Sequence, residues 1–594
     1  MNAQRLLSLA ALALLVIAPL VVSEFSVTLL NYIGLASLVA IGCSLLTGVG
    51  GLTSFGQAAF VGLGAYTTAV LTTQFGWSPW LTLPAGLALT AMVAMLLALI
   101  TLRLSGHFLP VGTIAWGISL YYLFANVDGL GGQTGITGVP PLQVADHVLN
   151  TGREFYYLVW FFVVLALIAV RNLLDSRPGR AIRALRGGIT MAESCGVDTQ
   201  HYRAVIFLLS ALVACLSGWL YAHLIRFVNP SPFSINLSIE YLFMAVIGGA
   251  SHVWGAVVGA TVLTVLKQWL QDILPRLIHA SGNFETIVFG LLMVLLLQRA
   301  RTGIMPLLAR FLPLDRPVRV PALDAGAARQ DAPLGARERP LAGELLLEVR
   351  DVVRRFGGLV AVNRISFEMR AGEILGLIGP NGAGKSTLFN LITGVLAPSA
   401  GEVWLRGERI DRLRSRQIAQ RGVARTFQHV QLRPAMSVIE NVAIGAHLRA
   451  GGGVIGAALR LDRRSEASIL REARRQLERV GLGAELLVPA GSLPLGSQRI
   501  LEVARALTAD PMLLLLDEPA AGLRYQEKRA LADLLLRLRG EGVTILLVEH
   551  DMDFVMNLVD RLVVMQFGEQ IATGLPAQIQ ADPAVIEAYL GGVE

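Results

Sequence analysis

Residues 379–387 read Gly-Pro-Asn-Gly-Ala-Gly-Lys-Ser-Thr, a stretch that fits the phosphate-binding loop pattern G-x-x-x-x-G-K-[ST]. The apolar run 373–378 before it predicts a strand, and the pattern from Leu388 onward predicts a helix, which is the context that such a loop requires. Glycines let backbone N–H groups approach phosphates, Lys385 supplies positive charge, and the Ser386 hydroxyl suits Mg²⁺. The sequence therefore predicts an ATP and Mg²⁺ site in an α/β domain.

Two further apolar runs, which predict buried strands, end in titratable side chains. The first is followed by Asp517 and Glu518, and the second by Glu549 and His550. A carboxylate at the end of a strand beside a phosphate loop is placed to hold Mg²⁺ through water, and a second carboxylate next to it can orient or deprotonate the attacking water. A histidine at the end of the second of these strands, His550, can contact the γ-phosphate. Alone, each of these residues is typical of a solvated strand end, but their order behind a phosphate loop predicts a hydrolytic site.

This order of motifs resembles the ATPases of ABC transporters, and the resemblance covers residues 345–594. It implies that Phe356 stacks on adenine, and that Gln428, in Arg-Thr-Phe-Gln, senses the γ-phosphate and reports to a membrane domain. It also implies a Mg²⁺-linked aspartate, a catalytic glutamate and a switch histidine at Asp517, Glu518 and His550. The implied Mg²⁺ ligands are Ser386, Gln428 and Asp517, and the implied nucleotide contacts are Phe356, Gly379, Asn381, Gly382, Gly384, Lys385, Ser386, Thr387 and Gly496.

The signature of that family, Leu-Ser-Gly-Gly-Gln, is altered in this chain. Residues 493–498 read Leu-Pro-Leu-Gly-Ser-Gln, so Pro494 stands where a serine would bind the γ-phosphate, while Gly496 is kept. A helical pattern still follows, and the N–H groups at its start can face an anion. We therefore expect an active ATPase, and the sequence does not specify whether Pro494 and Ser497 weaken this half of the ATP site.

The composition divides the chain into two unequal environments. Residues 1–310 hold only 25 of the 93 charged residues, so the first half is very apolar and the second has the charge of an ordinary soluble domain. Residues 311–344 carry scattered prolines without apolar periodicity, which predicts a linker. The sparse cysteines, without a CxxC pair, indicate packing residues rather than disulfides or a metal site. No basic run is interleaved with aromatics, so nucleic acid is not a predicted partner.

The apolar half predicts a polytopic α-helical membrane domain. Its apolar stretches approach the ~20 residues that cross a bilayer and lie at 6–23, 28–47, 58–74, 80–102, 108–126, 155–173, 204–227, 241–269 and 284–298. Arginine-rich ends place the segment after 173 and the segment after 298 in the cytoplasm. An even number of crossings between them requires a break near Gly248–Gly255, which gives spans of about 235–249 and 253–270. We expect eight to ten spans.

Polar residues at breaks in apolar runs are candidates for a translocation path. Ser54 and Gln57 lie at one break, and Gln133 and Thr134 at another, for which an external loop is the alternative. At the Gly248–Gly255 break, a substrate path and close packing through small residues are both open. Lys267 and Arg226 are interpreted as side chains that snorkel to the interface.

The basic loop 175–203 predicts a short amphipathic helix at the cytoplasmic face. Ile182, Leu185 and Ile189 recur at helical spacing, with arginines between them. Such a helix can dock on a soluble domain as a coupling element, and binding to anionic membrane lipid is the alternative.

A finer resemblance is to importers of branched-chain amino acids. It rests on Phe356-Gly357-Gly358-Leu359-Val360-Ala361-Val362, Glu549-His550-Asp551-Met552-Asp553 and Ala588-Tyr589-Leu590-Gly591 in the ATPase part, and on Gly56-Gln57-Ala58-Ala59-Phe60, Gly64-Ala65-Tyr66, Arg177-Pro178-Gly179-Arg180-Ala181 and Ile247-Gly248-Gly249 in the membrane part. The chain resembles a permease subunit, residues 1–310, fused to an ATP-binding subunit, residues 345–594. The loop 177–198 is then the coupling element.

The resemblance implies ATP-driven import of branched-chain amino acids or related small solutes across the cytoplasmic (inner) membrane, with the ATPase domain in the cytoplasm. It also implies a second permease subunit, a second ABC ATPase subunit and an extracytoplasmic solute-binding protein as partners. An exporter is the first alternative, and a membrane sensor or channel gated by the ATPase is the second. The sequence does not specify the solute, the number of spans or whether the assembly is a homodimer.

Overall fold

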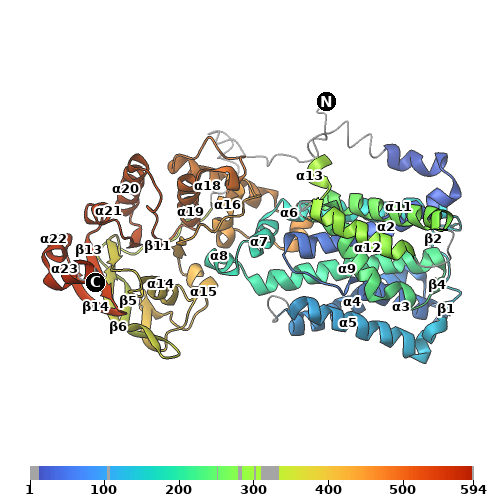
Figure 1. The fold of residues 1–594 in the computed structure, drawn as a ribbon, viewed down its shortest axis with the longest axis horizontal. Coiled ribbons are helices and arrows are strands. Elements are labelled where there is room, and N and C mark those ends of the chain that lie inside the picture. Colours follow the sequence, from blue (N-terminus) through green and yellow to red (C-terminus); the bar gives the residue numbers. More distant parts are fainter. Residues whose placement is uncertain are drawn as a thin grey trace. The chain divides into compact units, whose positions relative to one another are not determined.

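The computed structural model describes residues 13–102, 108–250, 252–278, 284–299, 303–308 and 334–590. The chain divides into two compact units (Figure 1). The first unit comprises Met1–Leu174 and Gln200–Pro317, and the second comprises Asp175–Thr199 and Val318–Glu594. Most of the basic loop 175–203, which the sequence predicts to be a coupling element, is thus part of the second unit.

The first unit is helical, and its sequence explains why. Among the described residues, six helical segments are long and apolar enough to cross a membrane, whereas α3 and α10 are shorter. The helices are α2 (Glu24–Cys43) with the π-helical turn η1 (Ser44–Val49), α3 (Gln57–Thr73), α4 (Pro79–Thr101), α5 (Phe108–Asn126), α6 (Gly152–Leu174), α9 (Thr199–Ile225), α10 (Ile235–Gly249), α11 (Val253–Ile278), α12 (Phe284–Arg299) and α13 (Met305–Leu308).

Short extended segments and single helical turns connect these helices. β1 (Ile136–Thr137) pairs antiparallel with β4 (Phe227–Val228), and β2 (Gln143–Val144) pairs with β3 (His147–Val148). The single turns are η2 (Asp128–Leu130), η3 (Gly132–Thr134) and η4 (Ser231–Phe233). Gln133 and Thr134 lie exposed in this loop region, which favours the loop interpretation over a place in a translocation path.

The helix break expected near Gly248–Gly255 is present, because α10 ends at Gly249 and α11 begins at Val253. Glycines bring the two helices into backbone contact there. A Cβ atom on Gly248 would lie 1.7 Å from the Gly255 carbonyl oxygen, and one on Gly259 would lie 1.8 Å from the Met244 carbonyl oxygen. The glycines of this break therefore serve close helix packing.

One interpretation of the membrane half needs correction. Lys267 lies well inside α11, and its ammonium donates to both carboxylate oxygens of Glu240, at 2.7 and 3.0 Å. A protein carboxylate, rather than the membrane interface, therefore neutralises this lysine. Arg226 follows the end of α9 and donates to the Asn150 side chain at 2.9 Å.

Two predicted segments fall partly outside the described residues. Part of the first apolar stretch, 6–23, is not described, although residues 13–21 are helical. Most of the predicted linker 311–344 is not described either.

The second unit contains two sheets, and its central sheet carries the phosphate loop. The six-stranded sheet has the order β10-β11-β12-β7-β13-β14, in which only the β13–β14 pair is antiparallel. Its strands are β7 (Ile374–Ile378), β10 (Val423–Arg425), β11 (Leu513–Asp517), β12 (Thr544–Val548), β13 (Arg561–Gln566) and β14 (Glu569–Gly574). Every residue of β7, β11 and β12 is buried, as expected for parallel strands covered on both faces.

An antiparallel sheet of order β6-β5-β8-β9 completes the strand content of this unit. Its strands are β5 (Leu345–Phe356), β6 (Leu359–Arg370), β8 (Ala400–Leu405) and β9 (Glu408–Arg409). The two sheets share one apolar core, in which β5 and β6 residues such as Leu347 and Ile365 pack with Leu375 and Leu546 of the central sheet. The phosphate loop is thereby anchored between two sheets.

Helices cover the sheets and form a separate cluster within the second unit. The helices are α7 (Arg177–Leu185), α8 (Ile189–Ser194), α14 (Lys385–Ile392), α15 (Ser415–Gln420), α16 (Val438–Ala443), α17 (Val454–Ala458), α18 (Arg463–Arg479), α19 (Leu495–Thr508), α20 (Tyr525–Gly540), α21 (Met552–Met556), α22 (Pro576–Ala581) and α23 (Pro583–Leu590), with the 3₁₀ segments η6 (Ile444–Arg449) and η7 (Ala490–Ser492). Helices α16, α18 and α19 pack around their own apolar core (Figure 1).

Candidate ATP site and coupling surface

The phosphate loop leaves the carboxyl end of β7, at the centre of the six-stranded sheet. Gly379, Gly382 and Gly384 all have positive φ angles, of 149, 83 and 99°. A Cβ atom on Gly379 would lie 2.0 Å from the Met565 carbonyl oxygen of β13, so both conformation and space require glycine there. Gly384 is the N-cap of α14, whose free N–H groups and dipole favour an anion.

Lys385 is the first residue of α14 and folds its side chain back over the loop. Its ammonium donates to the carbonyl oxygens of Gly379 and Pro380, at 2.7 and 2.9 Å. Burial lowers the pKa of this lysine, while Glu518 and Asp517 act in the opposite direction. A phosphate group in the loop would give this ammonium a stronger acceptor than the carbonyls. Asn381 and Ser386 are exposed beside it, whereas Thr387 is half-buried.

Asp517 ends β11 and is 3% exposed. Its Oδ1 atom has no hydrogen-bond partner among the described residues, and burial raises the pKa of this carboxyl to about 6, against the influence of Arg425. A buried carboxylate oxygen of this kind calls for a cation. The donor set of Asp517 and the exposed Ser386 hydroxyl therefore fits Mg²⁺, which prefers oxygen ligands and completes its shell with phosphate and water.

Glu518 follows directly, in a backbone conformation that favours glycine. Its φ angle is +47°, a strained value for a residue with a side chain. Gln428 donates from Nε2 to Glu518 Oε1 at 3.2 Å, and His550 Nδ1 lies 4.0 Å from Glu518 Oε2. The structure thus brings together three residues that are far apart in the sequence. His550 is 60% exposed, so its ring is open to solvent.

Glu549 was not predicted as a site residue, yet it holds the strained turn at Glu518 in place. Its side chain is buried, and Oε1 accepts from the Ala520 backbone N–H at 2.6 Å while Oε2 accepts from the His550 N–H at 3.3 Å. Burial raises the pKa of this carboxyl. Arg499 adds a donor to the Glu518 carbonyl oxygen at 2.8 Å. The only sequence signal for the role of Glu549 was its position next to His550.

Two more positioning residues escaped the sequence analysis. Thr426 Oγ1 accepts from the Asp517 backbone N–H at 3.2 Å. Arg425 is buried under the site and donates to Asn390 and Thr393 of the phosphate-loop segment at 2.9 and 2.7 Å. Burial lowers the pKa of Arg425 to about 10. These contacts join β10 to β11 and to the end of α14, so they fix the distance between the phosphate loop and the carboxylates.

Phe356, the residue implied to stack on adenine, ends β5 and is 43% exposed. The guanidinium of Arg354 lies 4.6 Å from its ring centroid. The ring is therefore held by a cation–π contact and still presents area to a planar ligand.

The altered signature forms the start of α19. Pro494 is the N-cap of this helix and gives no side-chain cap. A Cβ atom on Gly496 would lie 3.0 Å from Leu523 and 3.1 Å from the Glu527 carboxylate, so a side chain there would press on both. The first N–H groups of α19 have no carbonyl partner within the helix, which leaves them available to an anion.

The basic loop lies in the second unit, where its arginines bind carboxylates and carbonyls. Arg180 in α7 is 3% exposed and makes a two-pronged ion pair with Glu466 of α18. Arg183 donates to Glu440 of α16 at 2.8 Å. Arg177 donates to the carbonyl oxygens of His447 and Gly452 at 2.7 and 2.6 Å, and Asp198 pairs with Arg416 of α15.

These contacts favour docking on the ATPase domain over binding to membrane lipid. Arg180 and Arg183 are occupied by protein carboxylates, so they are not available to lipid phosphates. Ile182 and Leu185 are buried as their spacing predicts, but Ile189 is 41% exposed. That part of the periodicity was wrong, because Gly188, with φ of +130°, separates α7 from α8 and starts a new helical axis.

The loop also touches the chain segment that follows Gln428. A Cβ atom on Gly188 would lie 3.1 Å from Gln431 Oε1, and one on Gly187 would lie 2.8 Å from Arg433 Cδ. Gln431 is itself held by α19, because its N–H donates to Glu502 at 2.9 Å and its carbonyl oxygen accepts from Arg505 at 2.6 Å. One short segment thus joins the basic loop 175–203, the helix α19 and the glutamine beside Glu518.

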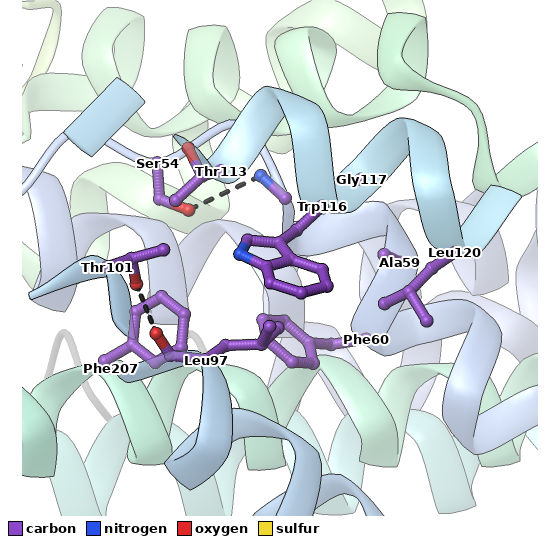
Figure 2. A pocket seen from close by; sticks show the side chains of 11 residues that line it. Ser54, Ala59, Phe60, Leu97, Thr101, Thr113, Trp116, Gly117, Leu120 and Phe207 are labelled. Atoms are coloured by element: carbon purple, nitrogen blue, oxygen red, sulfur yellow. Dashed lines mark hydrogen bonds between the residues drawn. The ribbon is translucent and has the colours of Figure 1, made fainter. Parts of the chain in front are cut away.

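In the first unit, Ser54 borders a nearly filled pocket. Figure 2 shows the Trp116, Phe60 and Phe207 rings around it. The pocket has a volume of about 10 Å³, room for about one water molecule. Ser54 Oγ accepts from the Gly56 N–H at 3.4 Å. This contact is that of a residue that positions the start of α3.

Comparison with known proteins covers both halves of the chain. The family described as branched-chain amino acid transport system / permease component matches residues 25–297. The ABC transporter family matches residues 362–521, and the family described as branched-chain amino acid ATP-binding cassette transporter matches residues 569–594.

Relatives of the ATP-binding half are matched over nearly their whole length. The high-affinity branched-chain amino acid transport ATP-binding protein LivG of Salmonella typhimurium is 45% identical over 249 residues, which are 41% of this chain and 98% of the relative. The corresponding protein BraF of Pseudomonas aeruginosa is 43% identical with the same coverage. A crystal structure of a nucleotide-free ATP-binding cassette from an ABC transporter is 31% identical, covers 42% of this chain and 99% of its own, and has a TM-score of 0.38.

The second unit is therefore an ATP-binding ABC ATPase whose hydrolysis is coupled to transport. The first unit is the membrane-spanning permease part of the same transporter. The chain belongs to the branched-chain amino acid family of ABC transporters and carries, in one polypeptide, a permease domain and an ATP-binding domain.

Proposed function

We propose that this chain is the fused permease and ATP-binding subunit of an importer that carries branched-chain amino acids, or closely related solutes, across the cytoplasmic membrane. The observation that carries the proposal is the junction of a permease match over residues 25–297 with an ATP-binding half that is 45% identical to LivG. The phosphate loop, Asp517 and Glu518 converge in that half. The domain that hydrolyses ATP and the domain that the solute crosses therefore belong to one polypeptide.

The family resemblance suggests the proposed hydrolytic roles, and the geometry of the site supports them. Lys385 and the loop N–H groups bind the terminal phosphates, and Phe356 stacks on the base. Ser386, Gln428 and Asp517 would hold Mg²⁺, which would screen the charge of the phosphates. Glu518, held by its neighbours at the end of β11, orients the attacking water and takes its proton.

His550 and Gln428 have positioning roles in this proposal. His550 lies within reach of the carboxylate of Glu518, where its ring can donate to the γ-phosphate. Gln428 donates to Glu518, so a nucleotide that competes for the glutamine amide shifts the segment that continues to Gln431. That segment touches Gly188, and through it the state of the nucleotide reaches the coupling loop.

The chain needs partners, because its family works as an assembly of permease and ATPase subunits. One chain supplies one phosphate loop and one signature helix. We propose that a second ATPase subunit faces this one, so that each phosphate loop meets the signature of the other, including Gly496. A second permease subunit and an extracytoplasmic binding protein complete the importer, in the cytoplasmic membrane with the ATPase on the cytoplasmic side.

Uptake measurements in right-side-out and inside-out vesicles test the proposal. Labelled L-leucine is expected to accumulate in right-side-out vesicles that contain the complete assembly, to require ATP inside and binding protein outside, and to stay out of inside-out vesicles given ATP outside. Accumulation in the inside-out vesicles would establish an exporter instead. ATP-dependent ion conductance without leucine movement would establish the sensor or channel.

A further inference from the structure

Glu240 and Lys267 form an ion pair between two predominantly apolar helices of the first unit. Glu240 lies in α10 and Lys267 in α11, and the ammonium donates to both carboxylate oxygens at 2.7 and 3.0 Å. An ionisable side chain within a membrane helix is unfavourable and is rare outside functional sites. Two such residues would be replaced by apolar ones if packing were their only role, so this pair points to a function.

The pair faces a cavity rather than a sealed core. The lysine side chain is 43% exposed and the glutamate side chain 22%. The cavity has a volume of about 340 Å³, within the range of ~300–1,000 Å³ that small-molecule sites have. Helices α2, α3, α9, α10 and α11 and the turn η4 line it, and its walls are mostly apolar or aromatic, including Leu35, Val61, Phe233, Tyr241, Met244 and Leu263.

A buried polar group lies next to this cavity along α3. Gln57 precedes Val61 by one helical turn and therefore shares its face of the helix. Gln57 is 0% exposed, and neither its amide oxygen nor its amide nitrogen has a hydrogen-bond partner among the described residues. A buried donor or acceptor that is left unsatisfied destabilises the fold. Such an amide is a second, independent sign that a polar molecule visits this region.

We propose that the cavity binds a zwitterionic α-amino acid with an apolar side chain. Lys267 pairs with the α-carboxylate, Glu240 pairs with the α-ammonium, and the apolar walls hold the side chain. The inference rests on the proposed uptake of branched-chain amino acids and assigns the solute a site within this chain.

The charges explain why this occupant fits. Binding exchanges one ion pair for two, so no unpaired charge is created in an apolar setting. A solute with one charge would leave either Lys267 or Glu240 without a partner. A phospholipid needs space for two acyl chains beyond its headgroup, whereas the volume matches one small solute.

Direct binding of radiolabelled L-leucine to the full chain in phosphatidylcholine nanodiscs tests the site. Two competitors each lack one charge of leucine: 4-methylpentanoate lacks the ammonium, and 3-methylbutylamine lacks the carboxylate. In the wild-type chain both are expected to compete at least tenfold more weakly than leucine. Lys267→Gln should weaken leucine binding at least tenfold and let the amine compete as well as leucine. Glu240→Gln should likewise weaken leucine binding at least tenfold and let 4-methylpentanoate compete as well as leucine.

Two further variants separate recognition from folding. Thr264→Trp fills the cavity from α11 and leaves the ion pair intact, so it should abolish leucine binding while the chain still binds ATP. Arg153→Gln is the matched control. It breaks the 2.7 Å ion pair between Arg153 and Glu24, two residues that do not line the cavity. This variant should change neither the leucine affinity nor the competitor ratios.

Each remaining outcome contradicts the inference. The site does not exist if the wild-type chain shows no saturable leucine binding, or if a tightly held phospholipid is found in the cavity and leucine does not displace it. The roles of the two charges are wrong if the competitor ratios stay the same in Lys267→Gln and Glu240→Gln. Leucine uptake by the assembled transporter with an unchanged KM in both variants would defeat this inference alone, whereas an assembly that moves no amino acid would defeat the proposed function.

Discussion

At the scale of single residues, Glu518 combines a strained backbone, a hydrogen bond from Gln428 and a position directly after the buried Asp517. Glu518→Gln keeps the shape and the hydrogen bonding of the side chain but cannot take a proton. We expect ATP affinity to stay within about twofold and turnover to fall by about 100-fold or more, since general bases contribute about 10²–10⁴-fold. Nucleotide binding and phosphate release by the purified chain measure the two quantities.

The control for this prediction is a glutamate in the same unit outside the site. Glu569 begins β14, is exposed and accepts from Asn363 at 2.8 Å. Glu569→Gln should leave turnover unchanged. Normal phosphate release by Glu518→Gln would overturn the role given to this carboxylate.

Pro494 is the second residue with a testable effect of its own. It occupies the N-cap of α19, where a serine hydroxyl would both cap the helix and reach an anion. Pro494→Ser adds one donor at a site that already presents N–H groups. A hydrogen bond to a charged group is worth about 1.5–3 kcal/mol, so we expect the ATPase rate of the assembly at low ATP concentration to rise about tenfold. An unchanged or lower rate would mean that this signature does not contact the phosphate.

At the scale of secondary-structure elements, the docking of α7 on α16 and α18 depends on buried charge. Removal of one partner from a buried ion pair costs about 3–5 kcal/mol, so Arg180→Ala leaves Glu466 uncompensated and should loosen α7. We expect leucine uptake to fall at least tenfold while ATP binding is kept. Uptake and nucleotide binding by the assembled transporter measure this.

A charge exchange separates a lost ion pair from a damaged fold. The double variant Arg180→Glu with Glu466→Arg restores opposite charges at the same place and should recover part of the uptake. Arg350→Ala is the matched control, because it breaks an exposed ion pair with Glu348 at 2.5 Å and should leave uptake unchanged. Full uptake by Arg180→Ala would show that α7 docking does not transmit the motion.

His447 makes the same surface sensitive to acid. Burial, with Arg177 and Arg180 nearby, lowers the pKa of this histidine to about 3, from about 6.5 in an unfolded chain. Because the unfolded state binds the proton first, stability falls as pH drops below about 6.5, by about 2 kcal/mol at pH 5. The melting temperature of the full chain, measured between pH 7.5 and pH 5, should fall less in His447→Gln. Equal decreases in both proteins would contradict this account.

The elements also show what a sequence can and cannot predict. The strand, loop and helix around Lys385 were predictable because the motif is local, and the meeting of Asp517, Glu518 and His550 followed from parallel strands that end at one edge. The Arg180–Glu466 pair was not predictable, because its partners are 286 positions apart and many arginines and glutamates could pair. The exposure of Ile189 was missed because the turn at Gly188 breaks the helical period.

At the scale of the whole molecule, the two halves differ in how much their sequences specify. In the membrane half the break between α10 and α11 was predictable from glycines and from the parity of crossings. The partner of Lys267 was not, because apolar helices carry little information about which faces meet. In the ATPase half a few invariant chemical requirements, such as glycine at a positive φ angle beside Met565, fix both structure and site at Gly379.

The fused architecture leads to a prediction about assembly. This chain holds one phosphate loop and one signature helix, and the signature carries Pro494. If a second, unlike ATPase subunit supplies the other signature, the chain alone should hydrolyse ATP at less than about a tenth of the rate of the complete assembly and should take up no leucine. Native mass spectrometry should then find one copy of this chain with one further permease and one further ATPase subunit. Leucine uptake by vesicles that contain this chain alone, with an ATPase rate that rises as the square of its concentration, would show instead that two copies form the transporter.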